Sequence, residues 1–309
     1  MRHYRKNKTE MSVLTIRGLT KRYGKITAVD NLSLEVEKGM AFGILGPNGS
    51  GKTTTLGIVL GIIHQNAGDF DWFDGKYGAW HRHHIGALLE TPNFYPYLNA
   101  VDNLQLIAHI KRVKTPRIDS LLELVNLYHR RNSKFRTFSL GMKQRLAIAA
   151  AMIGDPEVLI FDEPTNGLDP QGIAEVRQTL QEIAAMGKTI IMASHILDEV
   201  EKVCSHVAII KNGKMLASGT VGAIISDDML VEMAAADLPL LKSAMGQHPA
   251  VRRIDEEGDK LTLYLSEEVP PAELNKMAFE QGLSLSHLRV VKKSLESEFL
   301  EITGRADKT

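Results

Sequence analysis

Cysteine is nearly absent from this chain of 309 residues, where Cys204 is the single example. One thiol excludes an intramolecular disulfide framework and fits a reducing compartment. Long uncharged apolar runs are lacking too, because the best segments, 56–63 and 146–154, fall short of the roughly 18 residues that a membrane-spanning helix needs. If the protein works at a membrane, other chains must cross it.

An excess of charge of either sign is also lacking. The chain has 37 Lys and Arg against 37 Asp and Glu, so no overall field indicates a nucleic-acid partner, and none is expected. Residues 1–11 form a basic tail without the apolar core of a secretory signal, and we assign it no function. The length suffices for one large domain or two ordinary ones.

What the sequence does contain is a glycine-rich loop, Gly46-Pro-Asn-Gly-Ser-Gly-Lys-Thr53, between the apolar run 40–45 and a helix predicted over 53–63. Glycines let successive N–H groups turn toward an anion, and the helix adds its positive dipole end. Lys52 is placed to reach the outer phosphates of a nucleotide, and the Thr53 hydroxyl to ligate Mg²⁺. We therefore predict a nucleoside triphosphate site rather than an ordinary glycine turn. Its expected contacts are Gly46, Pro47, Asn48, Gly49, Ser50, Gly51, Lys52, Thr53 and Thr54.

Apolar runs typical of buried strands alternate with helical patterns, which predicts a parallel α/β sheet with right-handed crossovers. The strands are predicted at 42–45, 158–161 and 189–192, and the helices at 172–186 and 196–203. Half-buried strands are expected around 14–16 and 32–36, a hairpin over 206–217, and a mostly helical lobe over about 99–152.

Two kinds of side chain at strand ends carry candidate chemistry. Asp162 and Glu163 follow the buried strand 158–161. Beside a phosphate loop, Asp162 would hold Mg²⁺, directly or through water, and Glu163 would be the general base that polarises the attacking water. The alternative is a pair of solvated acids. His195 ends the next strand at the same sheet edge and can reach the γ-phosphate, although a lone histidine is more often structural.

Several segments resemble the motifs of the ATP-binding cassette (ABC) ATPases. Phe138-Ser-Leu-Gly-Met-Lys-Gln-Arg145 is similar to the signature motif, Asp162 to Asp169 resembles Walker B and the D-loop, and Ala193-Ser-His195 resembles the H-loop. Tyr23 falls where the family places an aromatic ring that stacks on adenine. Motif order and spacing match over residues 12–220.

The resemblance implies a P-loop NTPase fold of the ABC ATPase type that hydrolyses ATP with Mg²⁺. In the family, the residues matching Ser139 and Gly141 face the γ-phosphate held by a second nucleotide-binding subunit, and Asp169 belongs to the same shared site. A homodimer, a separate transmembrane permease and a peripheral position at the cytoplasmic face of the cell membrane follow from the resemblance. Taken alone, Ser139 reads as an ordinary helix N-cap.

The sequence departs from the usual family pattern at three positions. Leu140 replaces a glycine, Met142 replaces a glutamine, and Glu90 stands where the Q-loop carries glutamine. These changes resemble the bacitracin-resistance and lantibiotic-immunity branch, which implies an exporter. A carboxylate ligates Mg²⁺ more strongly than an amide does, so Glu90 is expected to contact both nucleotide and metal.

After residue 219 the pattern changes, and a small α+β domain of ferredoxin-like order is predicted over 228–304. Its strands are expected at 230–234, 251–255, 261–265 and 283–290, and its helices at 238–245, 271–281 and 295–302. Regulation and dimer stabilisation are both open as its role, and nothing in it looks catalytic.

Two further clusters have alternative readings. His81-Arg-His-His84 is either a basic surface loop or, less readily, a metal cluster. Phe94, Tyr95 and Tyr97 either pack between lobes or, as we favour, form a groove for a coupling helix of the permease. Two functions compete with transport: a soluble ABC ATPase acting on ribosomes or DNA, and a P-loop kinase. The transported molecule is not readable from this chain.

Overall fold

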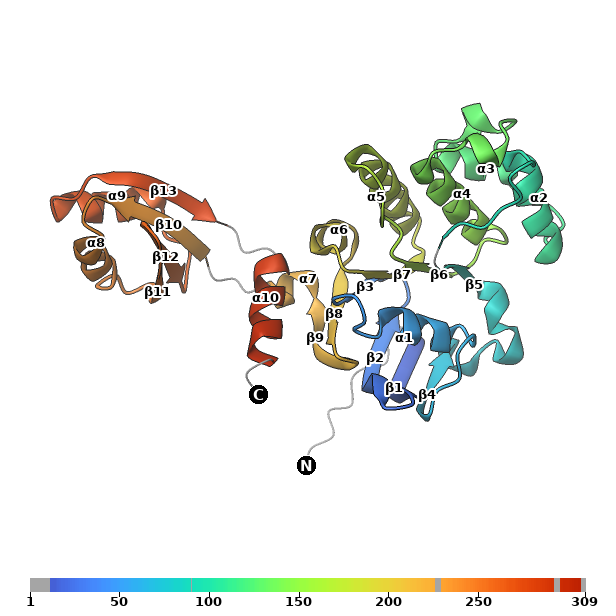
Figure 1. Ribbon diagram of the computed structural model, residues 1–309, viewed down its shortest axis with the longest axis horizontal. Coiled ribbons are helices and arrows are strands. Elements are labelled where there is room, and N and C mark those ends of the chain that lie inside the picture. The colour runs from blue at the N-terminus through green and yellow to red at the C-terminus, as the bar shows by residue number, and fades with distance from the viewer. Residues whose placement is uncertain (1–11, 90, 226–228, 292–294, 307–309) are drawn as a thin grey trace. The chain divides into compact units, whose positions relative to one another are not determined.

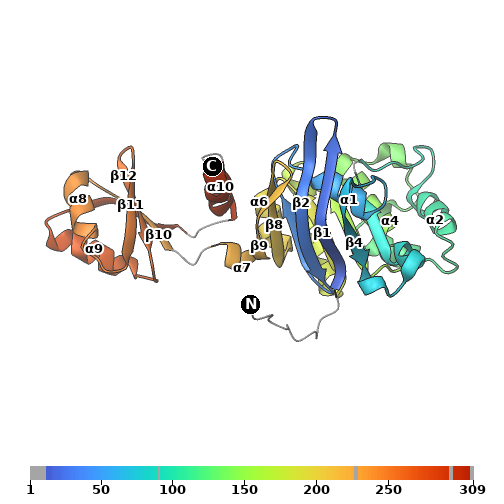
Figure 2. The ribbon, with the colours of Figure 1, turned by 90° about the horizontal axis from the view of Figure 1, so that it is seen from below.

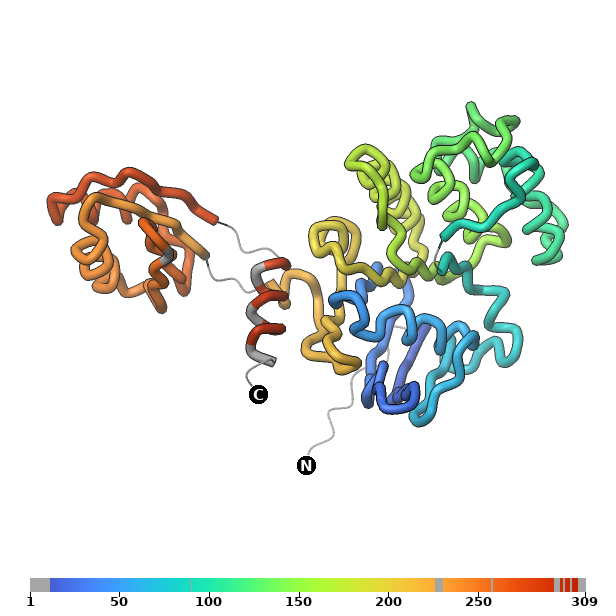
Figure 3. The backbone as a smooth tube through the Cα atoms, in the orientation of Figure 1, coloured from blue at the N-terminus to red at the C-terminus, as the bar shows by residue number. Residues whose placement is uncertain are grey.

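The computed structural model describes residues 12–89, 91–225, 229–291 and 295–306. The chain folds as two compact units, the first ending at Val221 and the second beginning at Gly222. Figure 3 follows the backbone by colour through both units. In the described part of the chain, no helix is long and apolar enough to cross a membrane.

A six-stranded sheet forms the centre of the first unit, in the order β5-β6-β7-β3-β8-β9. Neighbours run parallel from β5 to β8, and β9 returns antiparallel. Every residue of β3, β6 and β7 is buried, which is why these strands read as continuous apolar runs. The predicted parallel α/β sheet is confirmed. The strands are β3 (Ala41–Leu45), β5 (Ile85–Leu88), β6 (Val158–Asp162), β7 (Thr189–Ser194), β8 (His206–Lys211) and β9 (Lys214–Thr220).

A second, antiparallel sheet has the order β2-β1-β4. Its strands are β1 (Ser12–Tyr23), β2 (Ile26–Glu37) and β4 (Ala67–Trp72). Figure 2 shows β1 and β2 as a long pair. The sequence indicated only short pieces of these two strands and no strand at β4, because most of β4 is exposed or half-buried and lacks apolar alternation.

Helices cover both faces of the six-stranded sheet. α1 (Lys52–Val59) and the antiparallel sheet lie on one side, and α5 (Pro170–Ala185) and α6 (Leu197–Val203) lie on the other (Figure 1). α1 ends before the predicted Ile63 because Gly61 adopts a left-handed φ of 70° just after it. Trp72 packs beneath α1 and donates its Nε1–H to the carbonyl of Val59 at 2.8 Å.

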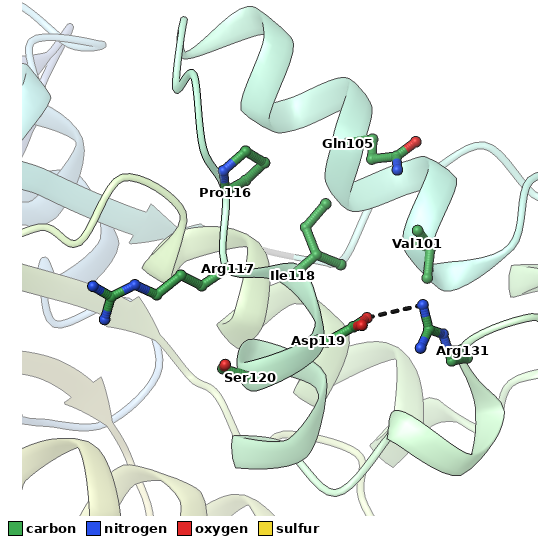
Figure 4. Close-up of a pocket in the computed structure, with 8 residues that line it drawn as sticks. All are labelled: Val101, Gln105, Pro116, Arg117, Ile118, Asp119, Ser120 and Arg131. Carbon is green, nitrogen blue, oxygen red and sulfur yellow. Dashed lines mark ion pairs between the residues drawn. The ribbon is translucent and has the colours of Figure 1, made fainter.

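The helical lobe contains α2 (Ala100–Ile110), α3 (Ile118–Leu124) and α4 (Leu140–Met152). A buried amide and a partly exposed ion pair hold it together. The Asn103 amide on α2 accepts from the N–H of Tyr95 at 2.9 Å and donates to the carbonyl of Asn99 at 2.9 Å. On the other side of α2, Asp119 at the start of α3 pairs with Arg131 at 3.0 Å, beside a pocket (Figure 4).

The second unit has its own apolar core and a four-stranded antiparallel sheet in the order β11-β12-β10-β13. Its strands are β10 (Met229–Ala235), β11 (Val251–Glu257), β12 (Lys260–Leu265) and β13 (Leu285–Val291). The helices after residue 220 are α7 (Val221–Ile224), α8 (Leu238–Met245), α9 (Pro271–Glu280) and α10 (Leu295–Ala306). From β10 to β13 the element order is βαββαβ, the split arrangement in which β10 and β12 pair although they are not consecutive.

We predict that Cys204 is chemically inert in the folded protein. It is buried behind α6, and burial raises the pKa of its thiol to about 12. Because the thiolate is the reactive form, iodoacetamide at pH 8 should label the protein quickly in urea and hardly at all in buffer. Mass spectrometry measures the labelled fraction, with a Ser120→Cys variant as the exposed control. Rapid labelling of native Cys204 would show that α6 opens easily.

Candidate functional site

A cavity of about 340 Å³ lies where the glycine-rich loop leaves β3 and enters α1. The loop lines it together with Tyr23 and Ala28 from the antiparallel sheet and Glu163 from the end of β6. The structure therefore brings the predicted adenine-stacking residue, the phosphate loop and the predicted base to one cavity. The loop residues lining it are Asn48, Gly49, Ser50, Gly51, Lys52, Thr53 and Thr54.

Two glycines of the loop are required by close backbone contacts. A Cβ on Gly46 would lie 2.2 Å from the carbonyl oxygen of Ile210, and a Cβ on Gly51 would lie 2.3 Å from that of Ala28. Gly51 also has a φ of 105°, which side chains rarely adopt. The loop is thus pressed against both sheets, and its curvature depends on the missing side chains.

Lys52, Glu163 and His195 form one continuous polar chain. The Lys52 ammonium donates to the carbonyl of Gly46 at 2.7 Å and pairs with Glu163 Oε1 at 3.2 Å. Glu163 Oε2 lies 2.7 Å from Nδ1 of His195 and accepts from the His195 backbone N–H at 3.3 Å. Both partners converge on a single carboxylate, although Lys52 begins α1, Glu163 follows β6 and His195 follows β7.

The backbone at Glu163 is itself unusual. Its φ is 49°, a left-handed value for a residue that is not glycine, and its N–H donates to the carbonyl of Ala193 on β7 at 2.9 Å. Such a conformation costs about 1 kcal/mol or more and is concentrated at functional sites. Asp162, the last residue of β6, is buried beside it.

The residues present fit a phosphate group and a magnesium ion. No described side chain caps the N-terminus of α1, and no acidic residue lies in its first turn, so this end of the helix suits an anion. The buried Ser50 hydroxyl finds no hydrogen-bond partner among the described residues. Thr53 and Asp162 offer the hard oxygen donors that Mg²⁺ prefers.

Other predicted site residues do not line this cavity. Ser139 is the N-cap of α4, where its hydroxyl accepts from the N–H of Met142 at 3.3 Å. Asp169 is the N-cap of α5, where it accepts from the N–H of Gly172 at 3.0 Å. Gly141 lies where α4 meets α5, since a Cβ there would stand 3.4 Å from Cα of Gly172. Glu90 lies outside the described residues.

The two remaining clusters differ in their geometry. Tyr95 and Tyr97 are 50% and 64% exposed, with ring centroids 5.7 Å apart, whereas Phe94 packs on Phe135. The histidines of the 81–84 segment turn to different partners: His81 to the carbonyl of Gly78, His83 to Trp80 and His84 to Glu157. Within the described ranges, no three His, Cys, Asp or Glu side chains are grouped to hold a metal ion.

The sequence analysis did not predict that Ala28 lines the cavity or that the Asn103 side chain binds the backbone of Tyr95 and Asn99. Ala28 lines the site only because β2 folds over the phosphate loop, and no signal in the sequence marks that contact. Asn103 carried a usable signal, namely an amide placed on the apolar face of a predicted helix. Such a side chain is expected to be buried only with partners.

Comparison with known proteins identifies the family of this chain. The model of the ABC transporter family matches residues 29–166. The bacitracin transport ATP-binding protein BcrA of Bacillus licheniformis is 36% identical over 301 residues, which are 95% of this chain and 98% of BcrA. The lantibiotic transport ATP-binding protein SrtF of Streptococcus pyogenes is 39% identical over 207 residues, 66% of this chain and 89% of SrtF.

A solved structure agrees with these relatives. CbiO1 of Clostridium perfringens, part of the ABC transporter complex cbiONQ, superposes with a TM-score of 0.62 and 26% identity, over 78% of this chain and 97% of CbiO1. The chain therefore belongs to the ATP-binding proteins of the ABC transporter family. The family, its P-loop NTPase fold and the bacitracin and lantibiotic branch are as the sequence motifs predict.

The two glycines Gly51 and Gly49 allow a matched test of the loop. Gly51→Ala should weaken ATP binding at least tenfold, because its Cβ meets the backbone of Ala28. Gly49 has a φ of 81° but open space around it, so Gly49→Ala should cost only about 1 kcal/mol of stability. Fluorescent ATP-analogue titration and thermal melting measure both. Equal affinities in the two variants would contradict the close contact.

Proposed function

We propose that this chain is the ATP-hydrolysing subunit of a multi-subunit ABC exporter, peripheral at the cytoplasmic face of the membrane, that powers a separate permease. Residues 12–220 would be the nucleotide-binding domain, and 228–304 a small domain with no catalytic part. The observation that carries the ATPase assignment is the contact of Glu163 with both Lys52 and His195 beside the phosphate loop.

Lys52 lies where it could bind a phosphate group, and contacts within the chain keep its ammonium there. Without phosphate its charge is satisfied by Glu163 and by the Gly46 carbonyl. An incoming γ-phosphate is a stronger partner for the ammonium than a single carboxylate, so Lys52 would turn to the phosphate. This exchange would free one oxygen of Glu163, so that ATP binding itself would prepare the base.

Glu163 would then accept a proton from the attacking water, and His195 would hold the carboxylate in place. The bond between His195 Nδ1 and Glu163 Oε2 fixes the orientation of the base while the other oxygen faces the site. A bound Mg²⁺ would neutralise the phosphate charges, with Thr53, Asp162 and Glu90 as its proposed protein ligands. Tyr23 would stack on the adenine ring.

A second copy of the chain would complete the site. Ser139, Gly141 and Asp169 stand at or near the N-termini of α4 and α5 and do not line the cavity of their own chain. The N-terminus of a helix is suited to a phosphate group. We infer that these residues face ATP bound to the other subunit, so that two ATP molecules hold a homodimer together.

The proposal of a permease partner is supported by the relatives and by one surface, and the export direction follows from the resemblance to the bacitracin and lantibiotic branch. BcrA and SrtF are named as transport ATP-binding proteins for bacitracin and a lantibiotic. Tyr95 and Tyr97 present two neighbouring exposed rings, and Asn103 holds the backbone beneath them. Exposed aromatic side chains on a rigid loop suit an interface with a coupling helix.

Replacing the proposed base should stop ATP hydrolysis without loss of ATP binding. Glu163→Gln keeps the shape of the side chain and removes its basicity, so ATP hydrolysis should fall about 100-fold or more. ATP affinity should persist, and the ATP-bound dimer should accumulate on size-exclusion chromatography. Glu182→Gln, an exposed change on α5, is the control. Normal phosphate release by Glu163→Gln would refute the assignment of the base.

Replacing Tyr95 and Tyr97 by alanine should separate assembly from catalysis. Tagged protein solubilised from native membranes should bring down a polytopic membrane protein, and the double variant should lose it. ATP hydrolysis by the purified subunit should stay near the unsubstituted level, because neither ring lines the nucleotide cavity. Recovery of ribosomes or DNA without a membrane partner would favour a soluble ABC ATPase.

A further inference from the structure

A pocket of about 570 Å³ lies between the helical lobe and the start of β5, and it shares no lining residue with the nucleotide cavity or with the pocket of Figure 4. Three short segments line it: 82–85 before and into β5, 110–113 at the end of α2, and 153–155 after α4. Its size is that of a small-molecule site.

Lys111 places a poorly solvated cation in the wall of this pocket. Its ammonium donates to the carbonyls of Ala150, Ala151 and Ile153 at the end of α4, at 3.3, 3.3 and 3.1 Å. Burial lowers the pKa of Lys111 to about 8. Among the described residues no carboxylate forms an ion pair with it, so its charge lacks an anionic partner.

Arg82 adds a second cationic side chain to the lining of this pocket, and His83 adds an imidazole. The Arg82 guanidinium lies over Gly61, where a Cβ would stand 2.5 Å from its Nη2. In the described part of the chain, no carboxylate pairs with Arg82 or His83. The nearby acids are already engaged, since Asp155 pairs with Lys188 at 2.6 Å and Glu157 with His84 at 3.2 Å.

The rest of the lining combines apolar side chains with an imidazole and a carboxylate, from Ile85, Ile110, Val113, Ile153, Gly154, His84 and Asp155. We propose that this pocket binds a small anion with an apolar body, whose carboxylate or phosphate faces Arg82, His83 and Lys111. An anion there would supply the partner that the buried ammonium lacks, and the apolar body would cover exposed aliphatic surface. The site is independent of the ATPase proposal, because none of its residues takes part in it.

Trp80 makes the pocket observable. Its ring is 70% exposed and lies 5.4 Å from the ring of His83, whereas Trp72, the second of the two tryptophans, is buried. In a Trp72→Phe variant, the tryptophan fluorescence therefore comes from Trp80 alone. The probes are decanoate, decanol and decyltrimethylammonium, which share one tail and differ in charge, and inorganic phosphate, which has no tail. Calorimetry on the unsubstituted protein repeats each titration, in case Trp72→Phe does not fold.

Saturable binding of decanoate, at least tenfold tighter than that of the other three probes, is the expected result. Arg82→Ala and Lys111→Met should each weaken it at least tenfold, whereas Lys276→Met, an exposed change on α9, should leave it unchanged. Equal binding of decanol, of the cation or of phosphate would overturn the proposal. So would competition by an ATP analogue, or full affinity in both pocket variants.

Discussion

The carboxylate of Glu163 is the group on which the geometry of the proposed nucleotide site depends. It stands between the ammonium of Lys52, which begins α1, and the imidazole of His195, which follows β7. All three can meet because β3, β6 and β7 are adjacent and parallel, so their carboxyl ends reach the same sheet edge. Any shift of one strand along its neighbours would separate the Glu163 carboxylate from its partners.

The phosphate loop is held by the same arrangement. Its glycines lie against the carbonyl of Ile210 in β8 on one side and that of Ala28 in β2 on the other. The two sheets of the first unit therefore determine the curvature of the loop together. Contacts on both sides hold the loop in its curved form, and preorganisation of this kind lowers the cost of binding a highly charged phosphate.

The helical lobe is fastened at both ends of α2. Asn103 fixes the loop that carries Tyr95, and Lys111 fixes the end of α4. The N-cap Ser139 lies at the opposite end of α4 from Lys111. α2 thus connects the surface proposed for the permease to α4, whose N-terminus is proposed to face the second ATP. The pocket lined by Arg82 and Lys111 lies at the C-terminal end of α2.

Sequence alone indicated the local features of the proposed site and the strands that carry it. Gly46 to Thr53 specifies a phosphate loop by its backbone requirements, and buried apolar runs specify the strands that carry Asp162 and Ser194, because both signals are local. The element order of the second unit was also legible, since its strands alternate and its helices are amphipathic. The full length of β1 and the existence of β4 could not be predicted, because pairing between the strands stabilises these residues and no apolar pattern marks them.

Only the tertiary structure decided which distant groups meet. Ala28 against Gly51, Glu163 beside His195 and Lys111 at the end of α4 are separated in the chain and joined by packing. It also decided that Ser139 and Asp169 stay outside the cavity of their own chain. Sequence periodicity reports which face of an element is buried, whereas distances between elements follow from how the sheets and helices pack around one core.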